Sequence, residues 1–328
     1  MRRLCGPGVA PGDNPAARLG AAIGAMSLAG RDKLTLITSP GMFGFSLWVV
    51  QLVAESLGKD GRGVIPVAGE PLVDPDLYGE DRLFVYLRLE GDENDSIDGA
   101  LREVGDRGHP VITLRVRSRR ELGAELFRWE LAVAIAAAVI GVNPFDQPDV
   151  QMSKDRTGAI LGGPRGRLEL SAGADSIQRG AGDLARLLGS CREGDYLGIL
   201  AFLPAAGGVE GALRELRQKV VRRYRIATTL GHGPGYLHST GQLHKGGPAT
   251  GIYLLLTAPH RNDMAIPGRP YTLGGVTDAD SLGDIGALEQ LGRRLVHVRL
   301  PDDSAGAVES LTAEIDRHAA GAGRLQPQ

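Results

Sequence analysis

The chain has 328 residues, of which 42% are hydrophobic and 23% charged, a composition typical of a globular protein with one large or two medium domains. Its 37 basic and 39 acidic residues are well mixed and leave a net charge of −2, which argues against a nucleic-acid-binding or membrane-surface protein. Cys5 and Cys191 are the only cysteines and lie far apart, so we expect no disulfide framework, no cysteine-based zinc site and a cytoplasmic location. The apolar run at 131–142 is shorter than the roughly 20 residues that cross a bilayer.

Strands and helices are expected to alternate in the first half of the chain, after an N-terminal approach segment and helix over residues 1–30. The expected elements are strands at 34–38, 63–67, 83–89 and 111–116 and helices at 45–57, 96–104 and 121–140. This alternation predicts an α/β domain over residues 31–165, in which helices cover both faces of a parallel sheet in a three-layer sandwich. Asp149 is expected to cap a further helix that ends near residue 161, before a Gly-rich, charged boundary at 162–174.

Residues 170–320 predict a second, smaller α/β module. Its expected elements are helices at 177–188, 209–224, 279–292 and 304–319 and strands at 196–203, 226–230, 251–257 and 294–300. The order strand, helix, strand, strand, helix, strand is typical of a split βαβ unit, in which a histidine-containing loop joins the two middle strands. Residues 321–328 are expected to form a frayed C-terminal tail.

That histidine loop, Leu-His-Ser-Thr-Gly-Gln-Leu-His-Lys-Gly-Gly-Pro at 237–248, concentrates groups that can do chemistry. Histidine titrates near neutral pH and glycine-rich backbone can approach a ligand closely, so the loop is a candidate proton-transfer site. A polar surface loop with incidental histidines is the alternative. The two histidines are six residues apart with no matching carboxylate cluster, so no metal site is expected. The glycines at 231–235 match neither the spacing of a P-loop nor that of a dinucleotide-binding motif, so no nucleotide site is expected.

Two other segments carry candidate side chains. Gln51 and Glu55 are four residues apart on an expected helix and share one face, which suits a general base beside a positioning amide. An ordinary exposed helix face is the alternative. The segment Asn-Pro-Phe-Asp-Gln-Pro at 143–148 predicts a tight turn, followed one or two helical turns later by Lys154. A structural corner and a solvated helix end are the alternatives there.

Together, these segments resemble the phosphoglucose isomerase family, specifically the C-terminal part of the bacterial bifunctional transaldolase/glucose-6-phosphate isomerase fusions. Residues 51–59 resemble its Gln-x-x-x-Glu-Ser-x-Gly-Lys segment. Residues 143–148 with Lys154 resemble its Asn-Pro-Phe-Asp-Gln-Pro segment and the lysine that follows. Residues 237–242 resemble its Leu-His-Ser-x-Gly-Gln segment. The histidine segment comes last, as in the fusion proteins.

The resemblance implies a sugar-isomerase domain that interconverts glucose 6-phosphate and fructose 6-phosphate through a cis-enediol, a step of glycolysis and gluconeogenesis that needs no cofactor. It implies that Glu55 moves the proton between C2 and C1. It implies that His238 and Lys154 assist ring opening and proton movement at the sugar oxygens. For the remaining polar residues of these segments it implies substrate binding: Gln51, Gln242, Ser239, His244 and Lys245.

The family's N-terminal sugar-isomerase domain, with a Gly-rich loop and a Ser/Thr-rich loop that bind the sugar phosphate, has no recognisable counterpart in the sequence. We therefore expect a separate chain to supply that domain, and a homo-oligomer, because members of the family complete their sites across subunits. Two positions depart from the family segments: Val50 stands where glutamate precedes the glutamine, and Gly235 where arginine precedes the tyrosine. A non-catalytic sugar-phosphate-binding or partner-binding module is the alternative, as is an amino-sugar isomerase or sensor of the same fold.

Overall fold

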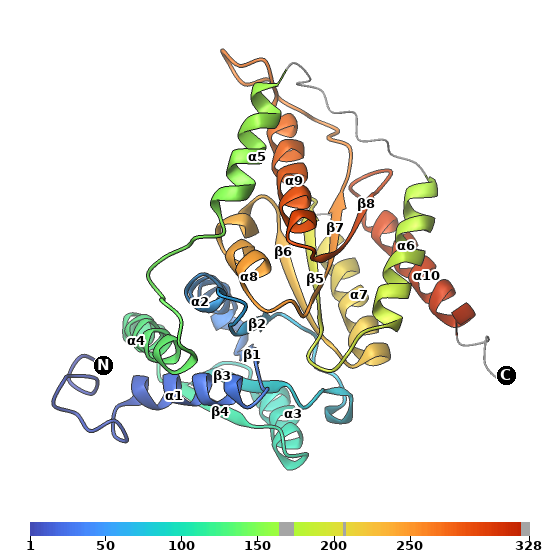
Figure 1. Cartoon of the computed structure of the whole chain (residues 1–328). Helices are drawn as coiled ribbons and strands as arrows, with labels where there is room; N and C mark the ends of the chain where they lie inside the picture. Colours follow the sequence, from blue (N-terminus) through green and yellow to red (C-terminus); the bar gives the residue numbers. More distant parts are fainter. Residues whose placement is uncertain (164–173, 206–207, 323–328) are drawn as a thin grey trace. The chain divides into compact units, whose positions relative to one another are not determined.

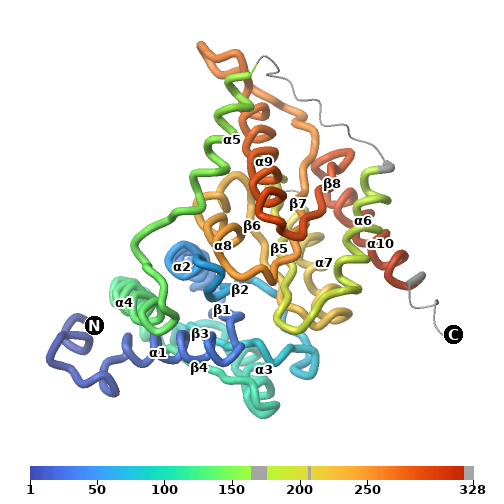
Figure 2. The backbone as a smooth tube through the Cα atoms, in the orientation of Figure 1, coloured from blue at the N-terminus to red at the C-terminus, as the bar shows by residue number. Residues whose placement is uncertain are grey.

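The computed structural model describes residues 1–163, 174–205 and 208–322, which form two compact α/β units (Figure 1). The first unit comprises residues 1–149 and 239–249, and the second comprises the described residues of 150–238 and those from 250 onward. The chain therefore leaves the first unit after residue 149, returns to it for residues 239–249 and then leaves it again (Figure 2). The boundary expected at 162–174 falls largely outside the described residues.

The first unit is built on a parallel sheet whose strand order is β2-β1-β3-β4. Its strands are β1 (Lys33–Thr38), β2 (Ile65–Ala68), β3 (Arg82–Leu89) and β4 (Val111–Val116). Its helices are α1 (Pro15–Leu28), α2 (Phe43–Leu57), α3 (Asp95–Asp106), α4 (Leu122–Ile140) and α8 (Gly241–Gly246), with 3-10 turns η1 (Pro40–Met42), η2 (Pro75–Leu77) and η3 (Arg119–Glu121). The central strands β1 and β3 are buried almost throughout, as expected for a parallel sheet covered on both faces.

Small residues allow α1 to pack tightly on α4. A Cβ atom added to Gly20 would lie 2.3 Å from the carbonyl oxygen of Ala132, and one added to Gly24 would lie 2.7 Å from Cβ of Val139. The first turn of α1 is fixed by Asn14, whose side-chain oxygen accepts hydrogen bonds from two backbone amides. The glycines of the N-terminal helix therefore have a packing role.

The second unit is a second parallel sheet, with strand order β6-β5-β7-β8. Its strands are β5 (Tyr196–Phe202), β6 (Ala227–His232), β7 (Gly251–Thr257) and β8 (Arg294–Arg299). Its helices are α5 (Gln151–Gly162), α6 (Ala174–Gly189), α7 (Val209–Tyr224), α9 (Leu273–Gln290) and α10 (Ala305–Ala322), with the 3-10 turn η4 (Gly235–His238). The strands β6 and β7, which the histidine segment connects, lie on either side of β5.

The α/β class with parallel sheets is confirmed, but the expectation of a smaller second module is wrong. Among the described residues the second sheet has four strands, as the first has. The sequence interpretation assigned the helix that ends near residue 161 to the first domain, whereas α5 packs along α9 in the second unit (Figure 1). None of the described helices has the length and apolar character needed to cross a membrane.

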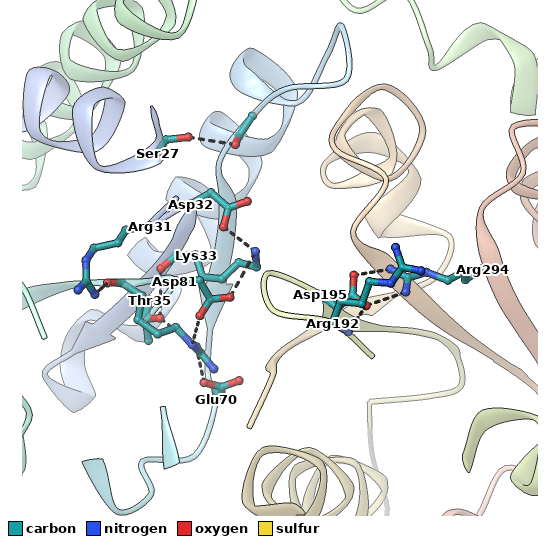
Figure 3. Close-up of polar contacts among 12 residues, drawn as sticks. Ser27, Arg31, Asp32, Lys33, Thr35, Glu70, Asp81, Arg192, Asp195 and Arg294 are labelled. Carbon is teal, nitrogen blue, oxygen red and sulfur yellow. Dashed lines mark hydrogen bonds and ion pairs between the residues drawn. The ribbon is translucent and has the colours of Figure 1, made fainter. Parts of the chain in front are cut away.

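Charged side chains are buried in ion pairs at the amino ends of the first unit's strands (Figure 3). Arg82 is fully buried, and its Nη1 donates hydrogen bonds to Oε2 of Glu70 at 2.8 Å and to Oγ1 of Thr35 at 3.0 Å. Lys33 is also fully buried and lies 2.5 Å from Oδ1 of Asp32. Each of these two buried cations has a carboxylate partner, so neither charge is left uncompensated in the interior.

The second unit has a similar ion pair at the amino end of its sheet (Figure 3). Both terminal nitrogens of Arg294 donate to the carboxylate of Asp195, at 2.6 and 2.7 Å. The carboxylate also accepts a hydrogen bond from the backbone amide of Arg192 at 2.8 Å. The pair connects the start of β8 to the turn before β5 and includes none of the predicted site residues.

Candidate active site

The predicted general base lies on α2, as the sequence spacing requires. Glu55 is half-buried, and Gln51, one turn earlier, is exposed. Val49 and Val53 of the same helix are fully buried against the sheet, so apolar residues fix the orientation of α2. The expected pair therefore lies on one helix, in the two turns before the helix ends at Gly58.

The segment after Glu55 is shaped to receive α8, which packs beside α2 (Figure 1). A Cβ atom added to Gly58 would lie 2.6 Å from Cα of Leu243. The backbone amide of Gly61 donates a hydrogen bond to the carbonyl of Gly246 at 2.8 Å. The glycine of the Glu-Ser-Leu-Gly-Lys segment is therefore needed for the close approach of the histidine-containing segment.

Gln242 makes its hydrogen bonds to protein groups of the first unit. It is fully buried, and its Nε2 donates to the carbonyl of Gly58 at 3.0 Å and to Oδ2 of Asp149 at 2.6 Å. Its Oε1 accepts a hydrogen bond from the backbone amide of Asp149 at 3.0 Å. Burial and three internal hydrogen bonds occupy this amide, and its implied contact with a sugar hydroxyl stays a prediction. Asp149 does not cap α5 as expected, since its carboxylate is bound to Gln242 and Val150 is the N-cap residue.

A second connection joins the Glu-Ser-Leu-Gly-Lys segment to the Asn-Pro-Phe-Asp-Gln-Pro segment. Lys59 is buried, and its Nζ lies 3.0 Å from Oδ1 of Asp146 and also donates to the backbone carbonyl of that residue. This hydrogen bond holds the pKa of the Asp146 carboxyl below its usual value. Asn143 Nδ2 donates to the other carboxylate oxygen at 2.9 Å. Sequence reasoning did not assign a role to Lys59, although it closes the family segment.

The other polar residues of the histidine segment differ in their exposure. His244 and Lys245 lie on α8 and are buried, and Nζ of Lys245 donates a hydrogen bond to the carbonyl of Gly241 at 3.1 Å. Ser239 is half-buried. The loop expected from the sequence therefore contains a short helix that faces the protein interior.

His238 and Lys154 belong to the second unit, where both side chains are exposed. The buried carboxylate of Asp284 binds a residue close to each of them. Asp284, on α9, is fully buried and accepts a hydrogen bond from the hydroxyl of Tyr236 at 2.7 Å. Its other oxygen accepts from Oγ of Ser153 at 3.1 Å. Tyr236 is two residues from His238 and Ser153 is adjacent to Lys154, so Asp284 holds the backbone beside both predicted catalytic residues.

The electrostatics of this cluster favour a neutral tyrosine as donor. Burial raises the pKa of Tyr236 well above its ordinary value, and the charge of Asp284 raises it further. Burial also raises the pKa of Asp280, one turn before Asp284, while a hydrogen bond with Thr157 and the charge of His238 lower it. Sequence reasoning missed both aspartates, and their i, i+4 spacing on one helix was the available signal.

Six of the eight predicted site residues lie in the first unit and two in the second. The first unit holds Gln51, Glu55, Ser239, Gln242, His244 and Lys245, and the second holds Lys154 and His238. The histidine segment crosses from one unit to the other between His238 and Ser239.

A carboxylate of the first unit binds the η1 turn that precedes α2. Oδ2 of Asp92 accepts a hydrogen bond from the amide of Gly41, in the η1 turn that leads into α2, at 2.8 Å. Oγ of Ser39 donates to Oδ1 of Asn94 at 2.5 Å, which ties together the loops after β1 and β3. The carboxylate of Asp92 therefore occupies one backbone amide of the turn that leads into this helix.

Comparison with curated proteins finds glucose-6-phosphate isomerases. The chain is 31% identical to that of Enterococcus faecalis over 161 residues, which are 38% of this chain and 36% of that protein. It is 29% identical to that of Prochlorococcus marinus over 226 residues, which are 58% of this chain and 41% of that protein. The matched region spans about two fifths of these relatives' length. No protein-family model matches the chain.

Comparison with solved structures finds distant similarities, including the two that follow. A hypothetical protein from Thermus thermophilus covers 96% of this chain and 83% of its own, at 15% identity and a TM-score of 0.37. Tagatose-6-phosphate ketose/aldose isomerase from Escherichia coli covers 96% and 93%, at 12% identity and a TM-score of 0.30. These scores are too low to support an argument, so the fold class rests on the two sheets described above.

Proposed function

We propose that this chain is the part of a glucose-6-phosphate isomerase that carries the catalytic base, and that it interconverts glucose 6-phosphate and fructose 6-phosphate through a cis-enediol. The observation that carries the proposal is the joining of three segments, distant in sequence, within the first unit. Gln242 is bound to Gly58 and Asp149, and Lys59 is bound to Asp146. These bonds hold the helix of Glu55 against the other two segments. Curated proteins named glucose-6-phosphate isomerase, which match part of this chain, support the same reaction.

The proposed chemistry is proton transfer by side chains. Glu55 removes the proton from C2 of the open-chain sugar and returns it to C1, and Gln51, one turn away, orients a sugar hydroxyl. His238 and Lys154 move protons at the ring oxygen and at the C1 and C2 oxygens. Each such acid or base contributes roughly 10² to 10⁴ in rate.

The phosphate of the substrate is proposed to bind to a separate chain with the Gly-rich and Ser/Thr-rich loops. The hydrogen bond between Asp92 and Gly41 supports this division, because it places a carboxylate on an amide of the η1 turn that precedes α2. Binding energy from a remote phosphate commonly positions the reacting carbons of such substrates. The segment order, with histidine last, further suggests the arrangement of the transaldolase fusion proteins.

The test is a coupled assay of fructose 6-phosphate conversion to glucose 6-phosphate, read through glucose-6-phosphate dehydrogenase. It is run on the chain alone and with a candidate chain that carries the phosphate-binding loops. We expect turnover that Glu55→Gln abolishes and Glu130→Gln, an exposed residue of α4, leaves unchanged. Absence of Glu55-dependent turnover in both settings would overturn the proposal.

A non-catalytic sugar-phosphate-binding module is the second candidate. The comparison with relatives favours it, because the matched region covers only about two fifths of the length of those isomerases. In that case fructose 6-phosphate raises the melting temperature of the chain without Glu55-dependent turnover. Thermal shift and the coupled assay together separate the two functions.

A further inference from the structure

A pocket of about 670 Å³ lies within the first unit, between α1, α4 and the edge strand β4. Pockets that bind small molecules typically measure about 300–1,000 Å³, so this one has the size of a ligand site. The residues proposed for the isomerase reaction are not part of its lining. The side chains that decide its chemistry come from all three elements: Arg18, Leu19 and Ala22 of α1, Ile112 and Leu114 of β4, and Arg128 of α4.

The floor of the pocket is apolar. Successive side chains of a strand point to opposite faces, so Ile112 and Leu114 share one face of β4. Leu114 is buried in the same core cluster as Leu19 of α1, and Ile112 packs against that cluster. Ala22, one turn after Leu19, adds a half-buried methyl group. This floor can accept an alkyl chain.

Two arginines supply the charge on this face of the sheet. Arg115 of β4 alternates to the opposite face, where a hydrogen bond from Arg88 lowers the pKa of Asp98 on α3 and the charge of Arg115 lowers it further. The cations on the side of α1 and α4 are therefore Arg18, which is exposed, and Arg128, whose side chain is 15% exposed. No acidic residue is part of the pocket lining.

The guanidinium of Arg128 is only partly satisfied by the protein. Its Nη1 lies 3.2 Å from Oε2 of Glu125 in an ion pair. That oxygen makes no hydrogen bond, and Nε of Arg128 has no acceptor, among the described residues. A buried donor without an acceptor is costly, and a planar guanidinium binds a carboxylate through two parallel N–H groups. Arg128 is thus suited to a carboxylate that enters the pocket.

We propose that this pocket binds a small amphipathic carboxylate of the class of the medium-chain fatty acids. The carboxylate lies between Arg128 and Arg18, and the alkyl chain covers Leu19, Ile112 and Leu114. The excess of positive charge selects an anion, and the apolar floor selects a ligand with a chain. The site does not use Glu55, so its occupancy is measured without reference to turnover.

The test is isothermal titration calorimetry of the full chain with sodium octanoate, below the concentration at which octanoate forms micelles. We expect saturable binding, and hexanoate binds about tenfold more weakly, because each buried CH₂ group contributes up to about fourfold. Octylamine has the same chain with a positive charge, and acetate has the charge without the chain. Neither is expected to bind saturably.

The arginines are tested by neutral substitutions. Arg18→Gln weakens octanoate binding by about two- to fivefold, as expected for an exposed charge pair. Arg102→Gln, at an exposed arginine of α3 outside the pocket, is the matched control and leaves binding unchanged. Glu125→Gln strengthens octanoate binding, because it releases Nη1 of Arg128. Adding Arg128→Gln to Glu125→Gln leaves no unpaired buried charge and weakens binding by about tenfold or more relative to Glu125→Gln alone.

Three results overturn the proposal. The first is octanoate binding no tighter than that of octylamine or of acetate. The second is octanoate affinity that the Arg128 substitution leaves unchanged. The third is the absence of saturable octanoate binding. In that case, self-association that Ala22→Glu abolishes and Ala21→Glu, at the exposed neighbour outside the pocket, retains would assign this face to a second copy of the chain.

Discussion

The hydroxyl of Tyr236 donates a 2.7 Å hydrogen bond to the buried carboxylate of Asp284 and thereby fixes the η4 turn, which ends at His238, on α9. Tyr236 is packed on its other side by the ring of Phe202, at a centroid separation of 5.6 Å. The turn that positions a predicted catalytic histidine is thus held by one charge-assisted hydrogen bond and one aromatic contact.

Replacing Tyr236 with phenylalanine isolates the hydrogen bond. The ring contact stays and the donor to Asp284 is lost, so the free energy of unfolding falls by about 1.5–3 kcal/mol, the usual value for a hydrogen bond to a charged group. Urea denaturation measures the change. Tyr271→Phe, at a partly exposed tyrosine, is the matched control. Equal midpoints for the two variants would contradict an anchoring role for Asp284.

Replacing Gly58 with alanine tests the approach of α8 to α2. The added Cβ lies 2.6 Å from Cα and 2.7 Å from Cβ of Leu243, so backbone must shift, and the expected loss is about 1–3 kcal/mol, the cost of an overpacked core. Gly44→Ala, in the same helix with nothing within 4 Å, is the control and leaves stability unchanged or slightly raised. Thermal unfolding compares them. A Gly58→Ala variant as stable as Gly44→Ala would contradict the close contact between Gly58 and Leu243 of α8.

The pair of Lys59 and Asp146 makes a prediction about pH. Lys59 lowers the pKa of Asp146, so the native state binds a proton less readily than the unfolded chain does. This contribution to stability is present above the unfolded pKa of about 3.9 and is lost as pH falls through the lower native pKa. The stability gap between the unmodified chain and Asp146→Asn is therefore constant near neutral pH and shrinks below about pH 4. Denaturation at pH 7 and pH 3 checks this, and a gap that grows on acidification would be inconsistent with the ion pair.

Local patterns were sufficient for most of the fold. Helix 209–224 and strand 251–257 have the bounds expected from the sequence, because apolar periodicity and flanking turns act within each element. The short helix α8 was expected as a loop, because six residues are too few to form a helix without tertiary contacts. Its contacts come from Gly58 and Asp149, nearly two hundred and nearly one hundred residues away.

The candidate site was only partly accessible to the same reasoning. Glu55 and Gln51 were predicted as site residues from their spacing on one helix, which is a local property, and the structure places both on α2. The interior role of Gln242 and the anchoring role of Asp284 depend on partners far along the chain, and a single sequence contains no direct record of such contacts. The division of the histidine segment between two units has the same origin.

Replacing Glu70 with glutamine tests the buried ion pair at the amino end of the first sheet. Arg82 is fully buried and lies 2.8 Å from Glu70, so removal of this carboxylate charge leaves the guanidinium with the more distant Asp81, whose Oδ1 is 3.9 Å from its Nε. Breaking one side of a buried pair costs about 3–5 kcal/mol. Glu80→Gln is the matched control, because Glu80 pairs with Arg31 at 2.7 Å but its side chain is 73% exposed. Exposed pairs contribute about 0–1 kcal/mol. Urea denaturation of both variants measures the difference, and a Glu70→Gln loss no larger than that of Glu80→Gln would mean that Asp81 alone compensates the charge of Arg82.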